Sequence, residues 1–283
     1  MSLESLPPLR EVVAKHNLLA KRSLGQSFIF DLNLTAKIAR SCGNLAACDV
    51  LEIGPGPGSL TRSLLLAGAR HVLAVEKDSR FLPALEEVAV ASEGRLAIRH
   101  ADATKYEPFG ELSPPVVIAS NLPFNVSTVL LSKWLLSNSW PPFWQSMTLM
   151  FQREVAERIL SPPGNRTYGR LSVLAQFRTI PRLVMHVPAK AFAPRPKVSS
   201  SVIRFVPIDS NSQIEPEHLM KVSAAAFGQR RKMLRSSLAR FGPSAEIALR
   251  RIGVDPCCRA EDLSVADYCL LARQFYSDPH SGK

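Results

Sequence analysis

The chain has 283 residues, of which 46% are hydrophobic and 21% are charged, and its formal net charge is +11. This composition is typical of a globular protein and excludes a largely disordered chain. The longest apolar stretches, such as residues 63–75, are interrupted by Arg70 and His71 and fall short of the ~20 residues that a membrane-spanning helix requires.

Cysteine usage and the N-terminus indicate the cellular compartment. The cysteines are odd in number and form no Cys-x-x-Cys motif, so the sequence predicts neither a disulfide framework nor a zinc site. The first ten residues lack the basic and then apolar layout of a secretory signal. We therefore expect a cytoplasmic protein without a bound metal.

Short apolar runs alternate with helical patterns through the first two thirds of the chain. The apolar runs predict strands, and the intervening segments predict helices. Continuous apolar strands that alternate with helices predict a parallel sheet covered on both faces, in a Rossmann-like α/β fold. Strands are expected at 50–54, 72–75, 96–100, 116–119, 147–151, 182–187 and 201–206, and helices at 59–67, 79–91, 129–136 and 170–177.

Beyond residue 217 the sequence shows helical patterns without a strand pattern. Helices are expected at 218–227, 230–241, 245–252 and 265–275. The polar segment 207–217 is a natural domain boundary. The sequence thus predicts a Rossmann-like domain over residues 1–208 and a small all-α domain over residues 209–283.

The positive charge is concentrated in the second half of the chain. Residues 158–208 contain nine Lys or Arg and no Asp or Glu, and residues 218–245 also lack a carboxylate. A one-sided positive surface attracts a polyanion, so nucleic acid is the expected partner. The alternatives are a solvated basic face and a membrane surface. Residues 230–235 lack the apolar stripe with interfacial Trp that membrane binding requires.

A glycine-rich turn, Glu-Ile-Gly-Pro-Gly-Pro-Gly over residues 52–58, follows the first predicted strand. Glycines here permit a sharp turn and the close approach of a ligand. Glu76, 22 residues after Gly54, can accept both hydroxyl groups of a ribose. The pattern suits a nicotinamide dinucleotide or S-adenosylmethionine. Ser59 and the Pro-rich turn favour S-adenosylmethionine, which carries no phosphate. Asp102 can accept from an adenine amine or act as a turn aspartate.

The fourth predicted strand is followed by Ser-Asn-Leu-Pro-Phe over residues 120–124, at the sheet edge where ligands bind in this class of fold. The Asn121 side-chain oxygen and the Leu122 carbonyl could accept the N–H bonds of an exocyclic amine and favour a pyramidal nitrogen in the transition state. Phe124 could stack on a flipped-out base. Alternatively, Asn121 caps the following helix and Phe124 belongs to the core.

These motifs resemble those of the ribosomal RNA adenine dimethyltransferases, most closely the bacterial small-subunit members. The likeness runs from about Leu18 to the last helix and includes residues 25–29, 168–172, 192–199 and 227–232. It implies an S-adenosylmethionine-dependent methyltransferase that dimethylates N6 of two adjacent adenosines near the 3′ end of 16S rRNA in the immature small ribosomal subunit. We expect a monomer, because nothing in the sequence indicates an obligate dimer. The implied catalytic residues are Asn121, Leu122 and Phe124, and the implied cofactor contacts are Ser27, Ile29, Gly54, Gly56, Glu76, Asp102 and Asn121.

Two positions depart from the family pattern in a way that bears on the site. Ser27 stands where Asn or His is usual, which leaves a main-chain contact to the cofactor. Phe124 replaces the commoner Tyr but keeps the stacking face. The resemblance also implies that the basic segments 158–204 and 230–240 hold the RNA backbone, because RNA loops are recognised through shape, phosphate contacts and stacking. Lys21, just before the 25–29 motif, could hold a phosphate at the mouth of the site.

Three other functions are open at the level of sequence. A methyltransferase of the macrolide-resistance type, acting on large-subunit rRNA, shares every catalytic motif, although residues 168–172 and 192–199 favour the small-subunit family. A binding module that checks ribosome assembly would also explain the charge. A dehydrogenase is disfavoured by Ser59 and by residues 121–124.

Overall fold

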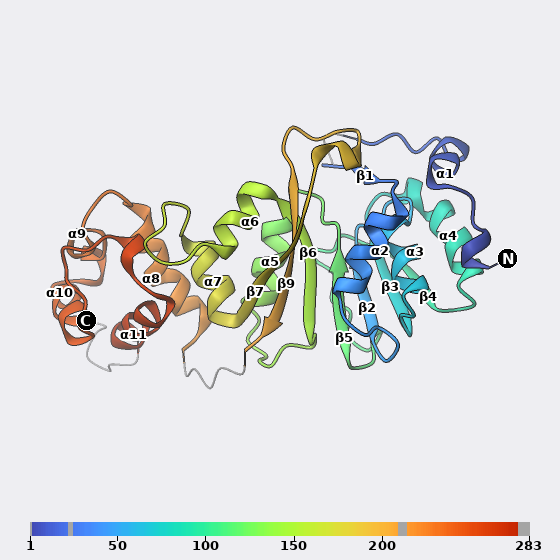
Figure 1. Cartoon of the computed structure of the whole chain (residues 1–283). Coiled ribbons are helices and arrows are strands. Elements are labelled where there is room, and N and C mark those ends of the chain that lie inside the picture. The colour runs from blue at the N-terminus through green and yellow to red at the C-terminus, as the bar shows by residue number, and fades with distance from the viewer. Residues whose placement is uncertain (1, 22–24, 209–213, 277–283) are drawn as a thin grey trace. The chain divides into compact units, whose positions relative to one another are not determined.

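The computed structural model of the chain describes residues 2–21, 25–208 and 214–276, and these fall into two compact units (Figure 1). Unit 1 comprises Met1–Lys133, Pro142–Ala156 and Arg182–Val206. Unit 2 comprises Trp134–Pro141, Glu157–Pro181 and Pro207–Lys283. Among the described residues, no helix is long and apolar enough to cross a membrane.

This division differs from the expected domain boundary at residues 208 and 209, because residues 157–181 group with the C-terminal helices. The physical reason is a shared core. Tyr168, Val173 and Phe177 are buried in the same apolar cluster as Leu219 and Val222. An independently folding domain over residues 209–283 stays a prediction.

A seven-stranded sheet, in the order β4-β3-β2-β5-β6-β9-β7, supports the candidate site (Figure 1). Strands β4, β3, β2, β5 and β6 are parallel to their neighbours, which confirms the Rossmann-like α/β class. The parallel pairing ends there, because β9 runs antiparallel to β6. The strand bounds are β2 Asp49–Ile53, β3 His71–Glu76, β4 Leu96–His100, β5 Val116–Ser120, β6 Ser146–Gln152, β7 Thr179–Val187 and β9 Ser200–Pro207.

Three helices of the described part of the chain pack against this sheet in one apolar cluster. Side chains of α2 (Leu32–Ser41), α3 (Ser59–Leu66) and α4 (Leu82–Ala91) share a core cluster with those of β2 and β3. The predicted helix at 79–91 begins with a short 3₁₀ turn, Ser79–Phe81, before α4. The predicted helix at 129–136 corresponds to α5, Ser127–Leu135.

Several elements were not predicted from the sequence. They include α1 (Leu9–Lys15), α2, α6 (Arg153–Leu160) and a small two-stranded sheet formed by β1 (Phe28–Ile29) and β8 (Phe192–Ala193). Helix α2 starts at an N-cap, where the Asp31 carboxylate accepts hydrogen bonds from the backbone N–H groups of Asn33 and Leu34. The β1–β8 pair brings residues 192–199, which we call the Pro-rich loop, against the N-terminal segment.

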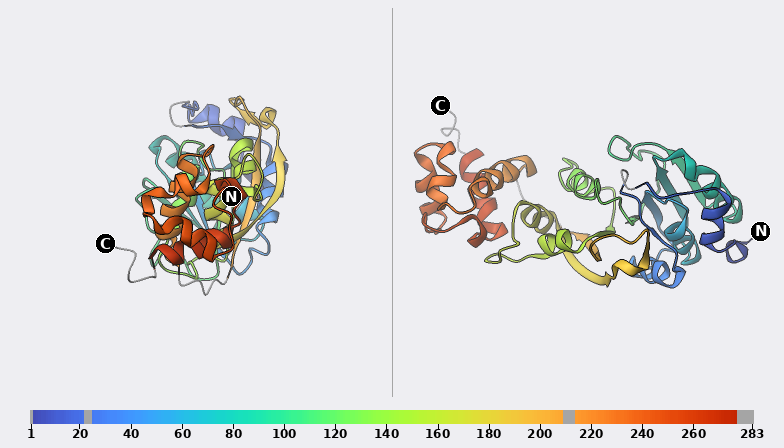
Figure 2. Two further views of the ribbon diagram at one scale, coloured as in Figure 1. Left: turned by 90° about the vertical axis from the view of Figure 1, so that its left-hand side faces the viewer. Right: turned by 90° about the horizontal axis from the view of Figure 1, so that it is seen from above.

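Unit 2 contains the predicted helices, with one exception. The predictions at 170–177, 218–227, 245–252 and 265–275 correspond to α7 (Arg170–Arg178), α8 (Pro216–Gly228), α10 (Ser244–Arg251) and α11 (Val265–Tyr276). Figure 2 shows from two directions that helices account for the regular structure of the described part of residues 214–276.

The continuous helix predicted at 230–241 is wrong. Residues 229–232 form a turn, and the regular structure resumes as α9 (Leu234–Ser237) and a 3₁₀ turn, Ala239–Phe241. The backbone N–H groups of Leu234 and Arg235 donate to the carbonyls of Cys258 and Pro256. These long-range bonds satisfy the first free N–H groups of α9, so the helix begins there rather than at Arg230.

Candidate active site

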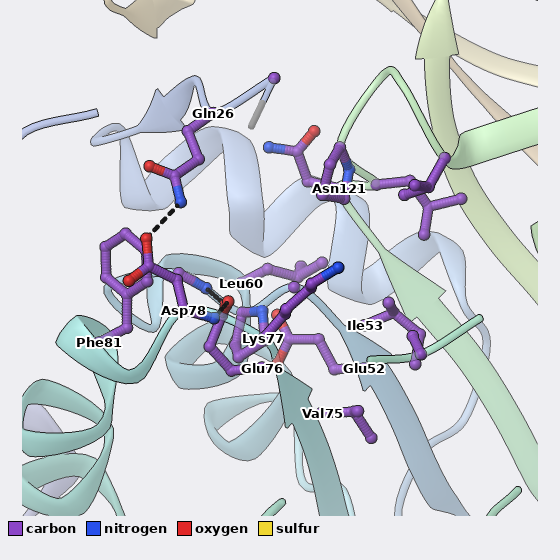
Figure 3. A pocket seen from close by; sticks show the side chains of 18 of the residues that line it. Gln26, Glu52, Ile53, Leu60, Val75, Glu76, Lys77, Asp78, Phe81 and Asn121 are labelled. Carbon is purple, nitrogen blue, oxygen red and sulfur yellow. Dashed lines mark hydrogen bonds between the residues drawn. The ribbon is translucent and has the colours of Figure 1, made fainter. Parts of the chain in front are cut away.

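A cavity of about 520 Å³ lies at the carboxyl ends of the parallel strands and belongs wholly to unit 1 (Figure 3). This is the edge of the sheet where ligands bind in open α/β folds. All the residues that the sequence assigned to the site lie on its wall: Ser27, Ile29, Gly54, Gly56, Glu76, Asp102, Asn121, Leu122 and Phe124. The structure thus brings together residues from five separate segments, while their individual roles stay predictions.

The glycine turn approaches the Asn-Leu-Pro-Phe loop too closely for a side chain. Gly54 has a φ of +66°, and a Cβ atom on it would lie 3.2 Å from Cδ of Pro123. Gly56 has a φ of +55° and faces the ring of Phe28. The left-handed backbone favours glycine at both positions, and at Gly54 the close approach of Pro123 adds a steric reason.

Glu76 is fixed at the end of β3 by two backbone groups. Its Oε2 accepts a 3.0 Å hydrogen bond from the N–H of Gly56, and its Oε1 accepts a 2.8 Å hydrogen bond from the N–H of Asp78. The side chain is buried, and this burial raises the pKa of the carboxyl, although the backbone donors oppose the shift. Glu76 therefore ties the glycine turn to β3 and keeps acceptor capacity toward the cavity.

Asp102 is both a turn aspartate and a residue of the cavity wall. Its Oδ1 accepts hydrogen bonds of 3.0 Å from the Thr104 N–H and 2.7 Å from the Thr104 hydroxyl. Its Oδ2 lies 2.7 Å from Nζ of Lys77. These donors hold the pKa of Asp102 well below its usual range, with Lys77 the largest contributor. Asp102 is thus a charged acceptor beside the cavity.

The loop after β5 places Asn121 and Phe124 on the cavity wall. The N–H of Val126 donates to the Pro123 carbonyl at 3.1 Å, which forms a turn ahead of α5. No hydrogen bond joins the Asn121 side chain to another residue of the described ranges 2–21, 25–208 and 214–276, so the capping alternative is wrong. Phe124 is only half-buried and lines the cavity, which contradicts a place in the core.

A polar network that the sequence reasoning missed joins the N-terminal segment to the end of β3. Nε2 of Gln26 donates to Oδ2 of Asp78 at 2.9 Å, as the dashed line in Figure 3 shows. Arg80 pairs with Asp78 and also donates to Oε1 of Gln26 at 3.3 Å. The Arg80 guanidinium holds the pKa of Asp78 well below its usual range. The pairing of residues 52 positions apart has no local sequence signal.

Glu52, the first residue of the glycine motif, is a further acid on the cavity wall (Figure 3). Its side chain is only 1% exposed, and its Oε2 has no hydrogen-bond partner among the described residues. Burial, together with the nearby Glu76 carboxylate, raises its pKa to about 8. Glu52 is therefore mostly protonated at neutral pH, which limits the negative charge on this wall.

The predicted basic surface is smaller than the sequence suggests. Arg178 is buried, because its guanidinium stacks over the Trp140 ring at 4.4 Å. Arg230 pairs with Glu261 at 3.4 Å. Both are thus held within unit 2. The exposed cations of the two predicted basic segments are Arg158, Arg166, Arg170, Arg182, Lys190, Arg195, Lys197, Arg231, Lys232, Arg235 and Arg240.

Comparisons with known proteins identify the family of the chain. The family model described as ribosomal RNA adenine dimethylase matches residues 17–276. The chain is 54% identical over 279 residues to the ribosomal RNA small subunit methyltransferase A of Paracoccus denitrificans, covering 98% of this chain and 99% of the relative. It is 55% identical over 273 residues to the protein of the same name from a Ruegeria species, covering 96% and 98%.

Solved structures support the fold. A dimethyladenosine transferase from Plasmodium falciparum superposes with a TM-score of 0.76 at 24% identity, over 88% of this chain and 98% of that chain. The 23S rRNA methyltransferase ErmE superposes with a TM-score of 0.65 at 24% identity, over 87% and 98%. At such identity these two matches bear on the fold alone.

Proposed function

The chain belongs to the ribosomal RNA adenine dimethylase family, and from this we propose that it dimethylates N6 of two adjacent adenosines near the 3′ end of 16S rRNA. It is an rRNA adenine dimethyltransferase that uses S-adenosylmethionine. The observation that supports the proposed site best is the wall of one cavity shared by Glu76, Asp102, Asn121 and Phe124. We further propose that it acts in the cytoplasm, as a monomer, on the immature small subunit.

The residues of the cavity fit this cofactor. A volume of about 520 Å³ is in the range of pockets for ligands of drug size. The glycine turn leaves no Cβ in the way of a close approach, and Glu76 and Asp102 offer carboxylate acceptors. Glu76 would bind the ribose hydroxyls and Asp102 the adenine amine. Bound S-adenosylmethionine supplies a methyl group made electrophilic by its positive sulfur.

The residues of the loop after β5 would then act on the target adenosine. The Asn121 side-chain oxygen and the Leu122 carbonyl accept the two N–H bonds of the N6 amine. These fixed acceptors stabilise the positive charge that develops on the nitrogen as its lone pair leaves the ring. The Phe124 ring stacks on the flipped base and fixes its plane. Methyl transfer then depends on the alignment of the target amine with the methyl donor and on these preorganised acceptors, so no nucleophilic side chain is required.

We propose that the exposed cations bind the RNA. Arg195 and Lys197 lie on the Pro-rich loop of unit 1, and Arg231 and Lys232 lie on the turn before α9 in unit 2. Cations of this kind bind phosphates by releasing condensed counterions, whatever the RNA sequence. A role in checking subunit assembly is compatible with this binding and does not compete with methylation. Family membership leaves no support for the dehydrogenase alternative.

The proposed function is tested by mapping the product. The purified protein, radiolabelled S-adenosylmethionine and small subunits from a strain that lacks this methylation should yield N6,N6-dimethyladenosine at two adjacent positions near the 3′ end of 16S rRNA. Large subunits from the same strain serve as the control and should stay unlabelled. Label in large-subunit rRNA instead would support the macrolide-resistance type of activity and overturn the proposal.

A further inference from the structure

Residues 25–29, which we call the connecting segment, touch three different parts of the site. The first part is the side of the cavity that is proposed to hold the cofactor. The Phe28 ring meets the Phe81 ring edge-on, with 5.6 Å between centroids. A Cβ atom on Gly56 would lie 3.5 Å from Cε1 of Phe28. The connecting segment therefore rests directly on the glycine turn.

On a second side, the connecting segment abuts the loop that carries the chemistry. Gly25 has a φ of +66°, and a Cβ atom there would lie 3.1 Å from Oδ1 of Asn125 and 3.5 Å from the backbone nitrogen of Phe124. Residue 25 thus lies against the backbone of Phe124, and its left-handed conformation favours glycine.

On the third side, the connecting segment is bonded to the Pro-rich loop. In the β1–β8 ladder, Phe28 pairs with Ala193 and Ile29 pairs with Phe192. The Ser27 hydroxyl extends this ladder by donating a 2.7 Å hydrogen bond to the Pro194 carbonyl. The Ser27 side chain is therefore engaged with the loop.

The Pro-rich loop carries two cations. Arg195 and Lys197 are exposed, and neither forms an ion pair with a carboxylate of the described residues. Exposed, unpaired cations of this kind are available to RNA phosphates. A short chain of contacts thus runs from these cations through Pro194 and Ser27 to the glycine turn.

We propose that Ser27 is a positioning residue that couples RNA binding at Arg195 and Lys197 to cofactor binding in the cavity. The inference rests on the proposed function, since RNA and the methyl donor are the two ligands it couples. Phosphate contacts that order the Pro-rich loop also order the connecting segment, because the Ser27 hydroxyl joins the two. By thermodynamic linkage, RNA then tightens cofactor binding by the same factor by which the cofactor tightens RNA binding.

The test measures the affinity for S-adenosylhomocysteine, a non-reactive probe, by equilibrium dialysis with and without saturating unmethylated small subunits. We expect the subunits to tighten binding to the wild-type protein about five-fold or more, within the usual range of coupling between sites. Ser27→Ala should lose most of this tightening, measured as the ratio of the dissociation constants without and with subunits. A loss of about five-fold is the scale expected for one side-chain hydrogen bond.

Two matched variants sharpen the result. Ser27→Thr keeps the hydroxyl and should restore the tightening. Ser113→Ala makes the same change at an exposed serine ahead of β5 and should leave the tightening intact. Among the described residues, the backbone N–H and carbonyl of Ser113 form hydrogen bonds, but its hydroxyl does not. The doubly substituted Arg195→Ala/Lys197→Ala variant removes exposed side chains and should lose the tightening as Ser27→Ala does.

The inference is overturned if Ser27→Ala keeps the full tightening, or if it weakens probe binding equally with and without subunits. The latter result would mean a local cofactor contact. It is also overturned if Arg195→Ala/Lys197→Ala keeps the tightening, a result that stands even if Ser27→Ala does not fold. Failure of the proposed function is distinguishable, since the wild-type protein would then place no methyl groups on the subunits at all.

Discussion

Gly54 and Pro123 lie so close together that a Cβ atom on the glycine would be 3.2 Å from Cδ of the proline ring. The first residue belongs to the glycine turn and the second to the loop that holds Asn121 and Phe124. In the proposed site, this close approach would set the distance between the methyl donor and the target amine, on which in-line transfer depends.

The variant Gly54→Ala should therefore weaken cofactor binding and slow methyl transfer, the latter by about ten-fold or more, because the added Cβ would meet the Pro123 ring and push the glycine turn away from the loop after β5. Calorimetry with S-adenosylmethionine and a methylation assay measure the two effects. Gly68→Ala is the control, because Gly68 has a φ of +90° but nothing within 4 Å of the added Cβ. Equal losses of activity in both variants would attribute the effect to backbone strain alone.

The raised pKa of Glu52 predicts a pH-dependent stability. The pKa of this carboxyl rises from 4.5 to about 8 on folding, so the folded state binds the proton more tightly than the unfolded state. The resulting stabilisation is complete below about pH 4.5 and is lost as the pH rises through about 8. Glu52→Gln imitates the protonated form and removes this dependence.

Thermal unfolding between about pH 5 and pH 9 measures the effect. The variant should gain stability relative to the wild-type protein as the pH rises toward about 8, because the wild-type carboxyl ionises in the unfolded chain from about pH 4.5 but stays protonated in the folded protein up to about pH 8. A constant difference in melting temperature across this range would contradict the assignment.

Much of the fold could be predicted because buried parallel strands are short continuous apolar runs. The observed β4, Leu96–His100, has the predicted bounds, and β2 and β3 differ from theirs by a residue or two. The antiparallel β9 could not be distinguished from a parallel strand, because pairing depends on long-range topology. The turn at 229–232 was missed because α9 begins where carbonyls of the 256–258 loop accept its first N–H groups.

The site was predictable where chemistry resides in a local motif. Residues 52–58 and 121–124 each carry their own spacing signal, and the structure brings both to one cavity. The network of Gln26, Asp78 and Arg80 and the bond from Ser27 to Pro194 were not predictable, because their partners lie 52 and 167 residues apart. Such contacts arise only when the chain folds.

Phe124 should contribute to kcat/KM for the RNA substrate rather than to cofactor binding. Phe124→Ala removes the stacking surface, and base stacking on an aromatic side chain contributes roughly 1–3 kcal/mol. We therefore expect kcat/KM for the RNA to fall about 5- to 150-fold while the Kd for S-adenosylmethionine changes little. Phe124→Tyr should keep the activity. Phe109→Ala, at a phenylalanine that is 80% exposed, is the matched control. Unchanged kcat/KM in Phe124→Ala would refute stacking.

The turn before α9 should contact RNA phosphates. Arg231 and Lys232 are exposed, whereas Arg230 pairs with Glu261, so the double variant Arg231→Glu/Lys232→Glu tests the surface without breaking that pair. Binding to small subunits should weaken, and the slope of log K against log salt should become shallower by roughly 0.7–0.9 for each lost phosphate contact. Filter binding across a salt series measures both.

The same charge change at Lys37 and Arg40, two exposed residues of α2, provides the control for net charge. That variant should keep the wild-type slope. If the two double variants weaken binding equally, net charge rather than a defined contact explains the effect, and the turn before α9 is a solvated face.

The most direct measurement concerns the acceptor that Asn121 offers to the target amine. In single-turnover assays on unmethylated small subunits, Asn121→Ala should lower the rate of methyl transfer about 10²–10³-fold, the cost of removing one preorganised transition-state group. Cofactor binding, measured by calorimetry on the same preparation, should survive. Methyl transfer at the wild-type rate in this variant would contradict the account, because the proposed acceptor would then have no part in the reaction.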